Sequence, residues 1–211
     1  DGNAARFDHA LGLAAAGYAS ARDDFGDPVA FIICRVHVQS LTPKPALAKA
    51  AIAGHDGKMT FTSHMQTALD EARQADERGE VPVGAVLVDA RGQVVARAGN
   101  RTRELHDPTA HAEILVIRAA CAAAQSERLP GYSLYVTLEP CAMCATAISA
   151  ARIARLYYAA SDPKSGGVAH GARVFSHPQC HHAPEIYDGI AADEAESLLK
   201  AFFQDRRDRG A

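Results

Sequence analysis

The chain has 211 residues, of which 48% are hydrophobic and 22% charged, and its formal net charge at pH 7 is -3. This length fits one ordinary domain with an appendage, or two very small domains, and the composition is that of a globular protein with a buried core. No apolar run approaches the roughly 20 residues that cross a bilayer, so we expect no membrane partner. The acidic balance excludes general charge-driven binding of nucleic acid, and any RNA contact must come from a local cluster and recognition of shape.

Residues 1–58 differ in pattern from the rest of the chain. They are rich in alanine, carry scattered Asp, Gly and Pro, and show no sustained period apart from Val29 to Val38. We therefore expect an N-terminal extension that is poorly ordered or non-native, and we place the functional domain at 59–211.

Regular patterns begin at Thr62. Apolar residues at helical spacing predict a helix over 64–78. Two runs rich in β-branched residues, 81–88 and 93–98, predict strands. The segment Asp89-Ala90-Arg91-Gly92 between them predicts a hairpin turn.

Helices and strands alternate in the rest of the chain. Asp107-Pro108-Thr109 predicts the start of a helix over about 110–124, and strand patterns follow at 133–138 and 153–159. Pro140 suits the first position of a helix that runs to about residue 151. An amphipathic helix over 190–207 closes the chain. This alternation predicts an α/β sandwich built on one mixed sheet.

The five cysteines do not resemble a disulfide framework. Cys34, Cys121 and Cys180 are scattered along the chain, whereas Cys141 and Cys144 form a Cys-x-x-Cys pair of the kind that binds metal. This usage favours a reducing, cytoplasmic setting.

His111-Ala112-Glu113 and Pro140-Cys141-Ala142-Met143-Cys144 together offer three soft metal ligands and one spare carboxylate. A structural zinc site is normally closed by four protein ligands, whereas a catalytic site keeps one position open for water. Cysteines at i and i+3 share one face of a helix, and a helix N-terminus lowers thiol pKa values. We therefore predict a catalytic zinc ion with His111, Cys141 and Cys144 as its ligands.

The spacing of His111 and Glu113 sets a condition on this site. Residues two apart do not share a face of a regular helix, so both can face the metal only if His111 stands at the helix start. Zinc would lower the pKa of its bound water from 15.7 to about 7 and generate hydroxide. Glu113 would take the proton of that water and hand it to a ring nitrogen of the substrate, and it would then protonate the departing amine. The hydroxide adds to the ring carbon that bears the amino group, and ammonia leaves.

Each motif alone has a plainer explanation. A lone Cys-x-x-Cys is often a redox pair or half of a structural zinc knuckle, and a lone His-x-Glu pair is common on protein surfaces. Both motifs together, each opening a helix after a strand, favour catalytic zinc. Cys180-His181-His182 has no matching second cluster, and we interpret it as a packed or surface loop.

The H-x-E and P-C-x-x-C pair is an established signature of zinc-dependent nucleobase deaminases. With Val81 to Val86, Asn100-Arg101, His106 to Ile114 and Leu134 to Cys144, the chain resembles the bacterial tRNA adenosine deaminases over about 65–207. The resemblance implies a cytidine-deaminase-like three-layer α/β/α sandwich with one mixed sheet of about five strands. It implies a homodimer with one Zn²⁺ per subunit that converts the wobble adenosine of arginine tRNA to inosine, with the anticodon stem-loop as partner.

The resemblance also implies roles for single residues. His111, Cys141 and Cys144 fall on the zinc ligands, and Glu113 on the proton shuttle. Residues implied in substrate binding are Asn100, Pro82, Val83 and Ala110, with Asn100 bonding the flipped nucleotide. Candidate RNA contacts are Arg101, Asp162, Lys164, Phe203 and Arg207. Core packing is an equally good explanation for one of Phe202 and Phe203.

Two alternatives stay open at this point. One is a deaminase of a free base or nucleoside, such as guanine or cytidine, since those relatives share the metal signature. Asp107-Pro108-Thr109 and the arginine-bearing final helix favour tRNA over these substrates. The other is a non-catalytic zinc or RNA-binding module. Glu113 speaks against it, because a purely structural site has no use for an unligated carboxylate.

Overall fold

A computed structural model describes residues 63–209 of the chain. The predicted extension over 1–58 lies outside the described residues and stays a prediction. The elements follow in chain order: α1 (Met65–Glu77), β1 (Gly84–Val88), β2 (Val94–Gly99), α2 (Ala112–Ala124), β3 (Ser133–Leu138), α3 (Ala142–Ala150), β4 (Arg155–Ala160), the short 3₁₀ helix η1 (Val174–Ser176), β5 (Glu185–Asp188) and α4 (Ala192–Arg209).

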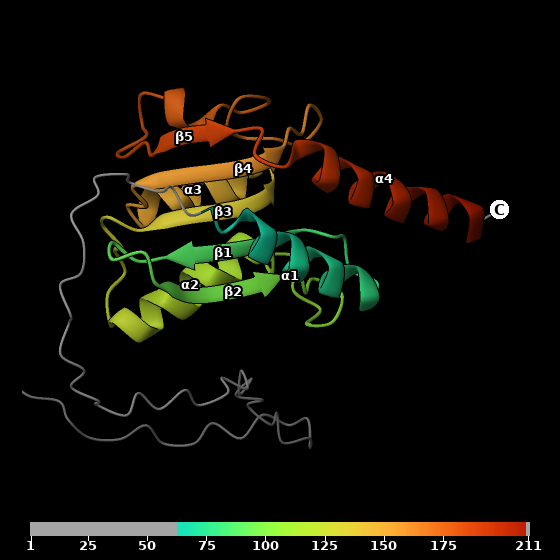
Figure 1. The fold of residues 1–211 in the computed structure, drawn as a ribbon. Helices are drawn as coiled ribbons and strands as arrows, with labels where there is room; N and C mark the ends of the chain where they lie inside the picture. The colour runs from blue at the N-terminus through green and yellow to red at the C-terminus, as the bar shows by residue number, and fades with distance from the viewer. Residues whose placement is uncertain (1–62, 210–211) are drawn as a thin grey trace, which may run out of the picture. The chain divides into compact units, whose positions relative to one another are not determined.

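The strands form one mixed sheet in the order β2-β1-β3-β4-β5 (Figure 1). β1 pairs antiparallel with both β2 and β3, whereas β3, β4 and β5 run parallel. The predicted mixed sheet of about five strands is confirmed.

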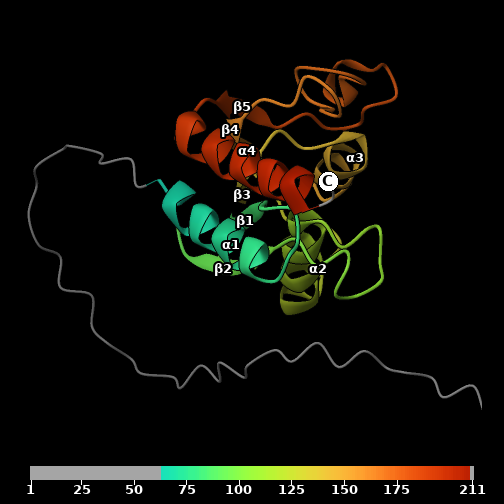
Figure 2. The ribbon, with the colours of Figure 1, turned by 90° about the vertical axis from the view of Figure 1, so that its right-hand side faces the viewer.

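Helices cover both faces of this sheet. Figure 2 shows α1 and α4 on one side and α2 and α3 on the other. β1 serves both cores, because alternate side chains of a strand point to opposite faces. Ala85 and Leu87 join the core under α2 and α3, while Val86 and Val88 join the core under α1 and α4. Burial on both faces explains the continuous apolar run of β1 and confirms the three-layer α/β/α prediction.

The hairpin between β1 and β2 forms where the sequence predicts it. The Asp89 carboxylate accepts the backbone N–H groups of Arg91 and Gln93 at 2.8 and 2.9 Å. Gly92 has a φ of +81°, a left-handed conformation that glycine adopts without steric cost. Among residues 63–209, no helix is long and apolar enough to cross a membrane.

Several boundaries differ from the predictions. β1 begins at Gly84 and not at residue 81, because the Val83 N–H donates to the Val81 carbonyl at 2.7 Å and closes a tight turn. α2 and α3 each begin two residues later than predicted, at Ala112 and Ala142. β5 matches no predicted strand, since all four of its residues are exposed and show no alternation of buried and exposed positions.

The start of β1 is packed tightly against α1. A Cβ atom on Gly84 would lie 2.0 Å from the Ala68 carbonyl oxygen and 2.5 Å from the Ala72 amide nitrogen. Both contacts are with backbone, which cannot rotate away as a side chain can. The absence of a side chain at Gly84 therefore sets how closely α1 approaches the sheet.

We expect Gly84→Ala to lower the free energy of unfolding by at least about 1–3 kcal/mol, because the added methyl group must push α1 away from the sheet. Urea denaturation measures this change. Val94→Ala is the control, since the Val94 side chain on β2 is 44% exposed and its loss should cost within about 0.5 kcal/mol. Equal stability of Gly84→Ala and the parent chain would contradict the packing described.

Candidate functional site

The residues of the predicted site meet at one edge of the sheet. β2, β3 and β4 end at this edge, and β1 begins there, as the pairing of Gly84 with Gly99 and of Leu138 with Ala160 requires. Asn100 directly follows β2. The segment before α3 follows β3, and a loop that starts at Ser161 follows β4. The carboxyl ends of neighbouring strands are where ligands bind in open α/β sheets.

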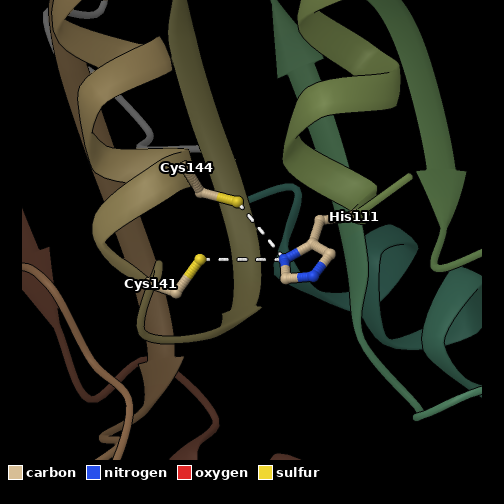
Figure 3. Close-up of side chains that lie close together, drawn as sticks. All are labelled: His111, Cys141 and Cys144. Atoms are coloured by element: carbon tan, nitrogen blue, oxygen red, sulfur yellow. Dashed lines mark hydrogen bonds between the residues drawn. The ribbon is translucent and has the colours of Figure 1, made fainter. Parts of the chain in front are cut away.

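Two metal-ligand candidates stand immediately before helices. His111 is the N-cap of α2, with φ -71° and ψ 150°, and Cys141 is the N-cap of α3, with φ -67° and ψ 173°. Both conformations are extended, and neither side chain caps its helix. Figure 3 shows that these side chains and Cys144, from the first turn of α3, point toward one another. His111 thus stands at the helix start, as its spacing from Glu113 requires.

The distances between the donor atoms fit a tetrahedral zinc ion. The Nδ1 atom of His111 lies 3.8 Å from the Sγ of Cys141 and 3.5 Å from the Sγ of Cys144. Bonds of about 2.3 Å to sulfur and 2.0 Å to nitrogen would place the nitrogen about 3.5 Å from each sulfur of a tetrahedral site, close to both distances. Within residues 63–209 this is the only His, Cys, Asp or Glu cluster with such convergence.

The electrostatics of the cluster favour negative charge on sulfur. A hydrogen bond from the Cys144 thiol, together with hydrogen bonding to His111, lowers the pKa of Cys141 to about 4 against the opposing effect of burial. The same interaction raises the pKa of Cys144, and burial raises it further. Hydrogen bonding to Cys141 raises the pKa of His111. A divalent cation binds thiolates and neutral imidazole and displaces these protons.

Glu113 lies in the first turn of α2 with 3% of its surface exposed. Burial is the main cause that raises the pKa of its carboxyl group, and the nearby His111 opposes it only in part. Its carboxylate is not one of the three convergent donors. A buried carboxyl group with a raised pKa beside a metal site can both accept and donate a proton near neutral pH.

Backbone hydrogen bonds join the predicted substrate residues to the metal-ligand segment. The Asn100 N–H donates to the Val83 carbonyl at 2.9 Å, and the Asn100 Oδ1 accepts the N–H of Ala112 at 2.8 Å. The Asn100 oxygen therefore caps α2, and its Nδ2 group is what it offers to a substrate. Ala110 is fully buried, and its carbonyl accepts the N–H of Arg101 at 3.0 Å. Pro82 and Val83, the predicted wall of the base pocket, are also buried.

Four of the five candidate RNA contacts line one groove. This groove has a volume of about 1160 Å³ and lies between the loop after β4 and α4. Its lining includes Asp162, Lys164, Phe203 and Arg207. Arg101 does not line it, and its guanidinium pairs instead with Glu104 at 2.6 Å.

One of the two neighbouring phenylalanines of α4 is buried and the other is exposed, as expected from the sequence. Phe202 is 7% exposed and the Arg206 guanidinium lies 4.5 Å above its ring, whereas Phe203 is 46% exposed and lines the groove. The last turn of α4 carries Arg206, Arg207 and Arg209. Asp205 and Asp208 lie among these arginines and Arg209 pairs with Asp205 at 2.9 Å, so Arg207 is the cation that this turn contributes to the groove lining.

Cys180-His181-His182 is a packed loop, as interpreted from the sequence. The Cys180 thiol and the Ser149 hydroxyl both donate to the His182 carbonyl, at 3.1 and 2.7 Å. The His182 ring bonds the Ile153 carbonyl at 2.6 Å. These bonds attach the loop to the end of α3.

The sequence analysis missed two buried carboxylates beside the site. Glu80 accepts the N–H groups of Arg103 and Glu104, both at 2.9 Å, and so holds the segment that leads to His111. Glu139 accepts the N–H groups of Asp162 and Ala169 and so holds the loop after β4. The available signal was an acidic residue next to an apolar run: Glu80 directly precedes the run that begins at Val81, and Glu139 directly follows β3. Such a residue is unremarkable when it faces solvent, and only the structure shows that these two are buried.

We expect Cys141→Ala to lose most of its zinc, from about one ion per chain, and to lower the Tm by several degrees because metal binding contributes to folding. Elemental analysis and thermal denaturation measure the two effects. Cys180→Ala is the matched control and should keep its zinc, since Cys180 bonds only within its loop and to Ser149. Unchanged zinc in Cys141→Ala would remove this residue from the site.

Comparison with known proteins agrees with this geometry. Residues 59–160 match the family described as the cytidine and deoxycytidylate deaminase zinc-binding region, and with the His/Cys/Cys cluster this makes Zn²⁺ the cofactor. The tRNA-specific adenosine deaminase of Agrobacterium fabrum is 63% identical over 146 residues, which are 69% of this chain and 95% of the relative.

Solved structures extend the comparison. One, from studies of A-to-I editing by tRNA:A34 deaminases at the wobble position of transfer RNA, is 64% identical with a TM-score of 0.63, over 64% of this chain and 99% of that one. A guanine deaminase from Nitrosomonas europaea is 22% identical with a TM-score of 0.57, over 66% and 82%, and shares the fold. Since a relative at 63% identity is matched over almost its whole length, the chain belongs to the tRNA-specific adenosine deaminase family.

Proposed function

We infer that this chain catalyses the hydrolytic deamination of adenosine to inosine at the wobble position of tRNA, and that residues 59–211 form its zinc-dependent deaminase domain. The observation that carries this proposal is the meeting of three metal donors with a buried, unligated Glu113. The names of the Agrobacterium relative and of the wobble-editing structure support tRNA adenosine as the substrate.

His111, Cys141 and Cys144 would hold the metal and leave its fourth position open. Bound zinc lowers the pKa of water to about 7 and so supplies a nucleophile at neutral pH. The start of α3 contributes partial positive charge from its free N–H groups, which stabilises the two thiolates. Glu139-Pro140 and the turn before His111 fix these ligands from the strand ends.

Glu113 would manage the protons of the reaction. Its carboxylate would accept one proton from the attacking water and give it to a ring nitrogen of adenine. It would then take the second proton from the hydroxyl group that has added to the ring carbon and deliver it to the amino group, which leaves as ammonia. Oxygen from water thereby replaces the amino group, and the product is inosine. Because Glu113 is 3% exposed, its proton passes to the substrate and not to bulk solvent.

The base pocket would be formed by the residues that adjoin His111. Pro82, Val83 and Ala110 are the proposed apolar wall of this pocket, and the Asn100 Nδ2 group would offer hydrogen-bond donors to a flipped base, because its Oδ1 is engaged by the Ala112 N–H. An anticodon loop is single-stranded, so extrusion of its base costs little energy. We propose arginine tRNA as the specific substrate, on the resemblance noted above.

The groove beside α4 would hold the rest of the anticodon stem-loop. The exposed ring of Phe203 can stack on a base, and Lys164 and Arg207 can pair with phosphates. Arg101 does not line the groove, so its proposed contact with RNA would lie outside the groove.

The proposal includes a homodimer in the cytoplasm. The dimer rests on the family resemblance, and the location rests on the tRNA substrate. Sedimentation should give a particle of twice the 22.3 kDa chain mass. A single-chain species across the working concentration range would contradict the dimer.

The direct test uses an anticodon stem-loop with a wobble adenosine. We expect inosine to appear when the stem-loop is incubated with the protein, and nucleoside chromatography measures it. A stem-loop with guanosine at that position is the control and should stay unchanged. Absence of inosine, with turnover of free guanine or cytidine, would replace this proposal by the free-base alternative.

We expect Glu113→Ala to keep one zinc ion per chain while kcat falls by at least about 10²-fold, because general acid–base catalysis is lost. Elemental analysis and the stem-loop assay measure these values. Glu127→Ala is the control, since the Glu127 side chain is 82% exposed and pairs only with Arg128. Loss of zinc in Glu113→Ala would instead make Glu113 a metal ligand.

A further inference from the structure

The loop after β4, residues 161–170, lies directly against the segment that carries Cys141. Gly166 pairs with Cys141 in an antiparallel bridge, and the Gly167 N–H donates to the Pro140 carbonyl at 2.8 Å. A Cβ on Gly167 would lie 2.5 Å from the Ala142 amide nitrogen, so glycine permits this close approach. One loop therefore touches the metal-ligand segment.

The same loop forms a wall of the groove. Its residues Ser161 to Ser165 line the groove opposite Phe203 and Arg207. The Asp162 carboxylate accepts the N–H groups of Lys164 and Ser165, both at 3.0 Å, and closes a turn. The position of Asp162 thus fixes where the Lys164 backbone stands.

The Glu139 carboxylate holds both ends of this loop. Its Oε1 accepts the N–H groups of Val168, Ala169 and His170 at 3.1, 2.9 and 2.9 Å. Its Oε2 accepts the Asp162 N–H at 3.0 Å and lies 2.7 Å from the His170 Nδ1. The side chain is fully buried.

Each oxygen of the Glu139 carboxylate has its own donors in the loop: Oε1 has three backbone N–H groups, and Oε2 has the Asp162 N–H and the His170 ring. Hydrogen bonds to an ionised acceptor are stronger than neutral ones. A buried carboxylate that satisfies several backbone donors fixes their relative positions more firmly than a surface contact could.

We infer that Glu139 is a positioning residue for the deamination of tRNA: it fixes the 161–170 loop against the metal-ligand segment and thereby sets the groove wall that receives the anticodon loop. This inference rests on the proposed function. Glu139 touches neither metal nor substrate in this account, and acts through the backbone of Asp162. Its removal should therefore weaken tRNA binding more than it slows the chemical step.

The test is Glu139→Gln, which keeps the side-chain volume. The glutamine oxygen is expected to stay with the three N–H groups at 168–170, which places the NH₂ group opposite the Asp162 N–H, donor against donor. We expect KM for the stem-loop to rise about tenfold while kcat stays within about twofold. Zinc should stay at one ion per chain, and amide hydrogen exchange should accelerate at Asp162 and not at Ala169.

Binding is measured apart from turnover in a Glu113→Ala background. There Glu139→Gln should raise the Kd for the same stem-loop by the same factor of about ten. In a Lys164→Ala background the additional effect of Glu139→Gln should shrink, because residues that act through one loop are not additive. Asp89→Asn is the matched control, since Asp89 also accepts two backbone N–H groups, but in the hairpin at the far end of β1.

A milder variant protects the test against a failure to fold. His170→Ala removes only the ring contact to Oε2, and the ring is 39% exposed, so a two- to threefold rise in KM is expected. Unchanged KM and Kd in both variants would overturn the inference. A fall in kcat with zinc loss and unchanged KM would also overturn it, since Glu139 would then support Cys141 alone. Wild-type protein that makes no inosine would contradict the proposed function, while hydrogen exchange at Asp162 would still report on the loop.

Discussion

The site depends on one constraint, which is that α2 and α3 both begin at the same edge of the sheet. His111 and Cys141 are the residues directly before these helices, and each is extended. A residue directly before a helix does not have helical backbone angles. Its side chain can therefore point toward the same metal site as the side chain of a residue in the first helical turn. This allows His111 and Glu113, two residues apart, to serve one metal site. It also places two helix N-termini beside the thiols, where partial positive charge favours the thiolate form. The close packing of α1 on Gly84 and the pairing of β1 with β3 hold the strand ends that carry both helices.

Charge is distributed so that an acidic chain can offer a binding surface for RNA. Glu80 and Glu139 contribute to the net charge of -3, yet both are buried and bonded to backbone N–H groups. These N–H groups stabilise the buried carboxylates, which do not stand at the surface where a phosphate would bind. On the groove side, Lys164 and Arg207 stand at the surface near the basic last turn of α4. Net charge therefore overstates the repulsion that an anticodon stem-loop would meet at this face.

The sequence predicted the chemistry better than the boundaries, for physical reasons. Ligand types and spacing identified His111, Cys141 and Cys144, and the spacing of Glu113 required His111 at a helix start. The two helices begin two residues late because residues before them pair with other segments: the Ala110 carbonyl accepts the Arg101 N–H, and Cys141 pairs with Gly166. Such pairing is invisible to a local pattern.

β5 was missed because a short edge strand whose four residues are all exposed has no apolar period. Glu139 was missed because its partners lie 23 to 31 residues further along the chain.

Substrate choice must reside outside the metal cluster. Three zinc ligands and a proton-carrying carboxylate would act in the same way on a free base and on a base within RNA, and the guanine deaminase fold at 22% identity accommodates the same arrangement of helices and strands. What a stem-loop adds is a backbone and neighbouring bases, and we propose that the groove between α4 and the 161–170 loop receives them. That loop is joined to the metal centre through Glu139 and the Cys141–Gly166 bridge. The position of the RNA wall is therefore fixed relative to the reacting atoms, and a small displacement of the loop would misplace the base even if the zinc ligands were intact.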